Sequence, residues 1–110
     1  MEWYTAKCIF RSVVAKRKSG KQLCERRYFL VKADSEESAA KVARNLAKRR
    51  QHSYLNAKGA RVTWIFEGVV AVKEVIVKRL SEGTEVYYEY FYRSSAGPTK
   101  SKTRRRARSR

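Results

Sequence analysis

Alternating apolar and polar positions predict a β-rich domain. The longest run of β-branched and aromatic residues covers residues 61–77, where Val62 and Trp64 alternate with Arg61 and Thr63. This period of two is typical of a strand with one buried face. A single straight strand of this length would measure about 56 Å, which is too long for a domain of this size, so the run must bend or turn.

Gly68 is the predicted position of that change in direction. It can form a β-bulge that redirects one strand, or it can share a two-residue hairpin turn with Glu67. A type I′ hairpin would hold Glu67 at positive φ, where Asn, Asp or Gly is usual, so the pattern favours the bend.

Residues 3–14, 23–32 and 85–92 predict three further strands, and residues 35–51 predict a helix. Asp34 or Ser35 can cap the first turn, and the two glutamates that follow suit the positive end of the helix dipole. The helix should fray near His52. Its apolar stripe consists of small and medium side chains: Ala39, Val42, Ala43, Leu46 and Ala47.

Together these elements predict an α+β fold, with an antiparallel sheet of four or five strands and one helix packed on one face. The chain order would be strand, strand, helix and then two or three strands. We expect residues 1–92 to form this domain and residues 93–110 to be a disordered tail. One helix cannot cover so wide a sheet, so the opposite face or an edge is a candidate surface for a protein partner or a second copy.

Charge narrows the choice of partner. The chain carries 27 Lys and Arg against 10 Asp and Glu, a net charge of +17, and eight of the basic residues lie in residues 93–110, which have no acid. Neither a membrane-spanning run nor a secretory signal is present, which predicts a cytoplasmic protein without a membrane partner. A polyanion such as RNA or DNA is the partner that this charge favours.

The predicted phosphate contacts lie in the tail and in the turn after the first strand. They are Lys100, Lys102, Arg104, Arg105, Arg106, Arg108 and Arg110, with Lys16, Arg17, Lys18 and Lys21. Other interpretations stay open, because the turn could be a solvated hairpin tip and the tail could be solubilising or bind an acidic membrane surface. The aromatic residues of 85–92 could stack bases, or could belong to a half-buried strand.

Catalysis, metal binding and cofactors are not predicted. His52 is the only histidine, and we expect it to be a surface or helix-capping residue. Two cysteines with one histidine do not make a zinc site. With a turn at Ser19–Gly20, Cys8 would oppose Val31, so we expect Cys8 and Cys24 to be unpaired thiols.

Several short motifs, taken in order, resemble a bacterial family of domains of unknown function, number 4288 in that series. They lie at residues 3–7, 33–39, 54–59, 62–64 and 82–87. The resemblance covers roughly residues 3–88, implies a small α+β domain, and implies nothing catalytic. The tail lies outside it. We therefore expect an accessory protein that binds nucleic acid without catalysis; the alternative is a protein-interaction module in which the tail is incidental.

Overall fold

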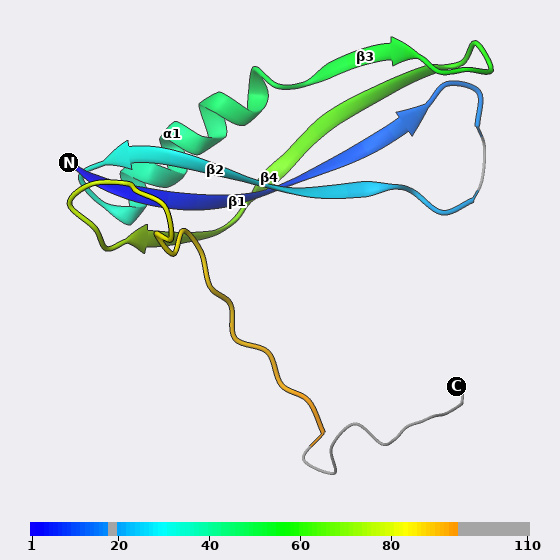
Figure 1. Ribbon diagram of the computed structural model, residues 1–110. Helices are drawn as coiled ribbons and strands as arrows, with labels where there is room; N and C mark the ends of the chain where they lie inside the picture. Colours follow the sequence, from blue (N-terminus) through cyan, green and yellow to red (C-terminus); the bar gives the residue numbers. More distant parts are fainter. Residues whose placement is uncertain (18–19, 95–110) are drawn as a thin grey trace.

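A computed structural model describes residues 1–17 and 20–94 of the chain. Within these residues it contains one helix and a four-stranded antiparallel sheet, with the strands in the order β2-β1-β4-β3 (Figure 1). The elements in chain order are β1 (Glu2–Val14), β2 (Cys24–Ala33), α1 (Glu36–Lys48), β3 (His52–Leu55) and β4 (Arg61–Val75). The predicted helix-on-sheet arrangement is confirmed, whereas a fifth strand does not form among the described residues.

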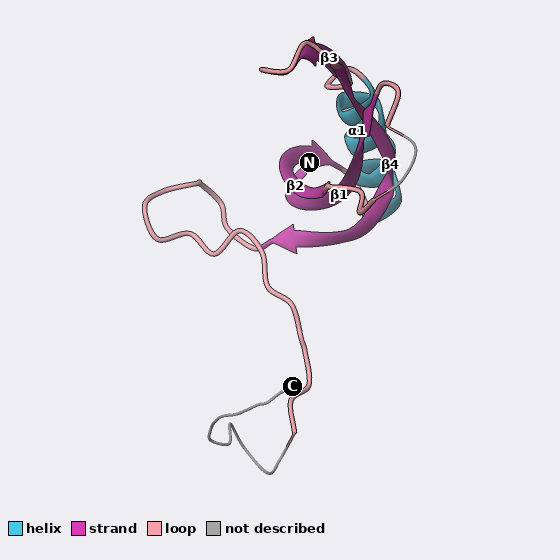
Figure 2. Cartoon of the chain, turned by 90° about the vertical axis from the view of Figure 1, so that its right-hand side faces the viewer, coloured by secondary structure: helices cyan, strands magenta, loops and turns pink. Residues whose placement is uncertain are grey.

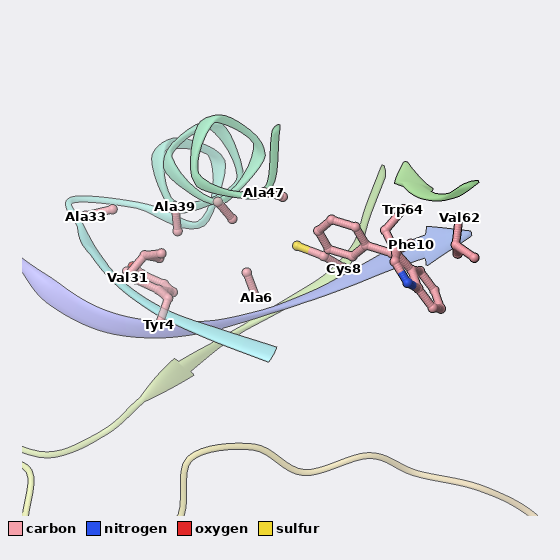
Figure 3. Close-up of a cluster of buried hydrophobic side chains, with 11 residues drawn as sticks. Tyr4, Ala6, Cys8, Phe10, Val31, Ala33, Ala39, Ala47, Val62 and Trp64 are labelled. Atoms are coloured by element: carbon pink, nitrogen blue, oxygen red, sulfur yellow. The ribbon is translucent and has the colours of Figure 1, made fainter. Parts of the chain in front are cut away.

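The core lies on the face of the sheet that α1 covers, and β1 is its centre. Tyr4, Ala6, Cys8 and Phe10 point to this face, as the alternation in β1 predicts, and all four are buried. Figure 3 shows Tyr4 and Ala6 near the helix, with Phe10 further along the strand. There the guanidinium of Arg27 lies 4.0 Å from the ring centre of Phe10. The core therefore extends beyond the helix, and there the Arg27 side chain covers the ring of Phe10.

The helix begins where its sequence signals predict. Ser35 is the N-cap, and its Oγ accepts a hydrogen bond of 3.1 Å from the backbone N–H of Ser38. Ala39, Ala43 and Ala47 are fully buried, so that α1 lies close to the curled sheet (Figure 2). Val42 is 38% exposed and lies at the margin of the stripe. The small side chains therefore make the contact that holds helix and sheet together.

Gly68 lies in a bend, and the hairpin alternative is wrong. β4 continues through it, paired to β1 from Val62 to Val75. The register slips once between Lys7 and Cys8 and again between Ile9 and Phe10 of β1, on either side of the Ile9–Gly68 pair. Extra residues on β4 at these two places increase its local twist and curvature. Two bulges thus bend the 15-residue strand, so that it fits within a domain of this size.

The end of the helix differs from the prediction, and an unexpected short strand follows it. α1 ends at Lys48, and His52 begins the short strand β3, which was not predicted. Its four residues are all exposed, so no alternation of buried and exposed positions marks it. His52 is on the surface as expected, and its Nδ1 lies 3.1 Å from the carbonyl oxygen of Arg50.

The first hairpin has another register than expected. Cys8 lies opposite Arg27 instead of Val31, because the turn is centred earlier than Ser19–Gly20. Cys8 and Cys24 are both free, which confirms that they are unpaired, and Cys8 is buried while Cys24 is exposed. Burial raises the pKa of the Cys8 thiol.

The expected last strand at residues 85–92 does not form. Val86, Tyr87, Tyr88 and Glu89 instead contact the face of the sheet opposite α1. We call residues 84–90, which include them, the strap. The hydroxyl of Thr5 donates a hydrogen bond to the carbonyl oxygen of Val86, and Thr5 is only 2% exposed. The strap therefore covers part of the face that the sequence left open for a partner.

Candidate nucleic-acid interface

Two loops meet at one end of the molecule, at the right of Figure 1. One joins β1 to β2 and the other joins β3 to β4. They adjoin because β1 and β4 pair as far as Val14 and Val62, and beyond this pair the N–H of Ala15 donates to the carbonyl of Arg61 at 2.8 Å. Charges on either loop consequently belong to one surface, which we call the basic end.

In the described part of the β1–β2 loop, a hydrogen bond joins the two sides and two lysines are exposed. A guanidinium nitrogen of Arg17 donates to the carbonyl oxygen of Lys21 at 3.0 Å, across Gly20. Gly20 has φ +109°, and Lys16 itself has a positive φ of 67°. Arg17 thus connects the two described sides of the loop, while the side chains of Lys16 and Lys21 are exposed.

The β3–β4 loop is organised by Asn56. Its side-chain oxygen accepts hydrogen bonds from the N–H groups of Lys58 at 2.9 Å and Ala60 at 3.0 Å. Gly59 has φ +80°, the left-handed conformation that closes such a turn. The N–H groups of Lys58, Gly59 and Ala60 all donate to Asn56, and the side chain of Lys58 remains exposed.

The charge of this end is of one sign. Residues 12–24 and 52–66 contain no Asp or Glu. Their basic residues with described positions are Lys16, Arg17, Lys21, Lys58 and Arg61. A surface with only cations on two adjoining loops creates a positive potential that attracts a polyanion.

Several carboxylates lie near the opposite end of the sheet. Burial raises the pKa of the Tyr4 hydroxyl, and so do the nearby carboxylates of Glu74, Glu2, Glu36 and Asp34. These acids belong to the start of β1, the end of β4 and the start of α1, far along the sheet from the two loops. Lys32 and Lys73 lie among them, opposite Trp3 and Thr5 of β1, so both signs of charge are present at this end.

Aromatic surface adjoins the basic end. The rings of His52 and Tyr54 lie 6.0 Å apart with an angle of 22° between their planes, and Tyr54 is 45% exposed. Tyr54 pairs with Val62, next to Arg61, whose guanidinium donates to Ser53 at 3.1 Å. Exposed aromatic faces beside cations can stack unpaired bases.

A shallow hollow of about 170 Å³ lies between β1 and the first loop. Arg17 and Lys21 line it together with Ser12. Ser12 is held by a hydrogen bond from its hydroxyl to the carbonyl of Leu23 at 2.9 Å. The hollow is small and two cationic side chains line it, which suits a phosphate group better than a large apolar ligand.

The structure describes only part of the predicted phosphate site. Lys16, Arg17 and Lys21 lie together at the basic end, whereas Lys18 and the predicted tail residues from Lys100 to Arg110 lie outside the described residues. Sequence analysis missed Lys58 and Arg61 as members of this surface. Asn56 and Gly59 are typical turn residues, but only the pairing of β3 with β4 places that turn beside the first loop.

The described residues contain no group of three or more His, Cys, Asp or Glu side chains arranged to hold a metal ion. They also include no helix with the length and apolar character needed to cross a membrane.

Comparison with known proteins finds one family. Residues 3–88 match the family described as "Domain of unknown function (DUF4288)", which agrees with the resemblance of the motifs. No curated protein and no solved structure matches the chain.

Proposed function

The chain belongs to the DUF4288 family, whose description names no activity, and from the geometry of its charged surface we propose that it is a non-catalytic accessory protein that binds nucleic acid. Its basic end and its Arg-rich tail would neutralise phosphates of RNA or DNA. The folded domain would set the orientation of the bound strand.

The observation that carries this proposal is the convergence of two loops into one cationic surface. Lys16 and Lys21 come from one loop, Lys58 from the other, and the pairing of Val14 with Val62 brings the loops together. Each cation placed on a phosphate releases condensed counterions, which provides affinity without sequence preference. The tail adds eight further cations to this total.

The exposed ring of Tyr54 favours nucleic acid over other polyanions. An acidic membrane surface or an acidic peptide would use the cations but would leave a flat aromatic ring beside them without a role. Unpaired bases stack on such rings, so single strands are the expected preference.

A protein-interaction module is the second candidate. The strap covers part of the sheet face that this function would use, which leaves the edges of the sheet. On the edge away from β1, β2 has no strand partner among the described residues. A nuclease-treated lysate in which the body, truncated after Tyr92, still retains a defined protein partner would favour this function. Loss of every partner with nuclease would favour nucleic-acid binding.

The salt dependence of binding tests the proposal. The logarithm of the affinity should fall with the logarithm of the salt concentration, with a slope of about −0.9 per phosphate contacted on duplex DNA and about −0.7 on a single strand. Truncation after Tyr92 should flatten the slope by several units. A full-length chain that ignores both polynucleotides in dilute salt would overturn the proposal.

A matched pair of charge reversals tests the basic end. Lys58→Glu and Lys41→Glu change the net charge equally, but Lys41 is an exposed residue of α1 and not of the two loops. We expect Lys58→Glu to weaken binding more. Equal effects would mean that only net charge matters and that the loops form no site.

A further inference from the structure

The strap contacts the sheet face opposite α1 through a carboxylate and through aromatic rings. A nucleotide offers the same two kinds of group, as its phosphate and its base. The carboxylate of Glu89 lies 3.0 Å from the Nζ of Lys7, and the hydroxyl of Tyr28 lies 3.3 Å from its other oxygen. The ring of Tyr87 meets the ring of Tyr28 edge-on, with their centres 4.9 Å apart. An anion and an aromatic ring of the strap therefore occupy adjacent positions on one face.

The face beneath the strap is cationic and aromatic. The register places Lys7 opposite Tyr28, and Lys73 opposite Thr5, on the same side of the sheet. Lys73 in turn lies 4.6 Å from the ring centre of Tyr88. Arg26, two residues from Tyr28, is close enough to contribute to the low pKa of Glu89.

The strap is held weakly. Tyr88 is 46% exposed and Tyr90 85% exposed, so little apolar area holds them in place. A pocket of about 140 Å³ remains between the strap and the end of β4. Segments with few buried apolar contacts open at low free-energy cost.

We propose that the sheet face around Lys7, Tyr28 and Lys73 is a second binding surface for single-stranded nucleic acid, which the strap occupies in the free protein as an internal substitute. The carboxylate of Glu89 takes the place of a phosphate, and the rings of Tyr87 and Tyr88 take the places of bases. This inference rests on the proposed function. It adds that the bound nucleic acid is single-stranded and that the domain has a second surface for it.

Single strands fit this surface because their bases are free to leave the stack. A phosphate placed on Lys7 would leave the adjoining base beside Tyr28, where Tyr87 lies now. In a duplex the bases are paired and cannot reach these rings. The strap leads directly to the cationic tail, so tail and face could bind one strand together.

The test compares the full-length chain with Glu89→Gln and with the control Glu82→Gln, which removes the same charge from the turn before the strap. The probe is a short fluorescent oligouridylate, and a duplex of the same length serves as its control. Glu89→Gln should bind the oligouridylate about two- to fivefold more tightly than Glu82→Gln, the range expected for a partly exposed ion pair. Lys7→Met should abolish this gain, because it removes the cation that both anions use.

The amide NMR signals of residues 86–88 provide the second measurement. Adding oligouridylate to the full-length chain should shift them toward the values of an unstructured chain, and adding the duplex should not. If the full-length chain binds but Glu89→Gln equals Glu82→Gln, or if the strap signals do not move, the second surface is wrong and the proposed function stands. If neither the full-length chain nor Glu89→Gln binds either probe, both are wrong. If Glu89→Gln alone binds, the masking is supported.

Discussion

The ammonium of Lys7 lies 3.0 Å from a carboxylate oxygen of Glu89, although the two residues are 82 positions apart in the chain. Lys7 is on the inner strand β1 and its side chain is 14% exposed, whereas that of Glu89 is 47% exposed. The pair joins the strap to the sheet at the point where the second face would otherwise be open. Its charge state therefore bears directly on how firmly the strap is held.

Acid should loosen the strap. The hydrogen bond from Lys7 is the main cause that lowers the pKa of Glu89 below its ordinary value of 4.5, and nearby positive charge adds to it. The pair contributes stability above that ordinary value, and the contribution is lost as the pH falls through the lowered pKa. An NMR titration of the Glu89 side chain should show this low midpoint, and the amide signals of residues 86–88 should shift with it.

Lys7→Met is the control for this titration. It keeps most of the aliphatic side chain but removes the charge, so the midpoint of Glu89 should rise. The same pair raises the pKa of Lys7, so its stabilising effect should persist until the pH exceeds the ordinary value of 10.5. An unchanged Glu89 midpoint in Lys7→Met would show that the ion pair does not hold the strap in solution.

Two glycine substitutions should differ in their effect on stability. At Gly20, φ is +109°, and a new Cβ would lie 2.6 Å from the end of the Arg17 side chain. That side chain can move, so the backbone conformation accounts for most of the cost, and we expect Gly20→Ala to lower the free energy of unfolding by about 1–3 kcal/mol. At Gly68 a Cβ would meet nothing within 4 Å, so Gly68→Ala should be nearly neutral. Urea denaturation measures both, and equal losses would contradict the assigned backbone of the first loop.

Loss of the helix cap should be visible in a thermal melt. Ser35→Ala removes the acceptor for the N–H of Ser38. The expected loss is about 1 kcal/mol, which corresponds to a fall in Tm of about 4–8 °C. Ser35→Asp keeps an acceptor and adds a negative charge at the positive end of the helix, so it should retain the wild-type Tm. A Tm for Ser35→Ala within error of wild type would show that another group caps the helix.

Much of the fold follows from local patterns. The alternation through Tyr4 and Phe10 predicts β1 and its buried face, because a half-buried strand shows its period directly. Ser35 and the alanine stripe predict α1 in the same way. Gly68 predicts the bend in β4 because a long run in a small domain must change direction. Each of these features depends on residues close together in the sequence.

The features that were missed depend on pairing between distant segments. β3 is four exposed residues long and is a strand only because β4 pairs with it, so that Lys58 and Arg61 join the basic end. The strap shows an alternation that suggests a strand, yet its contacts run from Val86 and Glu89 to side chains on the sheet face. Alternation of apolar and polar residues identifies a segment that suits a β-sheet. It does not show whether the edge of a sheet is free to pair with that segment.

Close packing of α1 on the sheet supplies the last prediction. Ala43 is fully buried at the middle of the helix and belongs to the contact between α1 and the sheet. A leucine there would have to displace the helix or force neighbouring side chains out of their rotamers, at a cost of about 1–3 kcal/mol. Ala40, on the same helix, is only partly buried, so Ala40→Leu should cost much less while making the same change in helix propensity. Urea denaturation of the two variants decides the matter: equal stability would mean that α1 lies further from the sheet than its alanine stripe indicates.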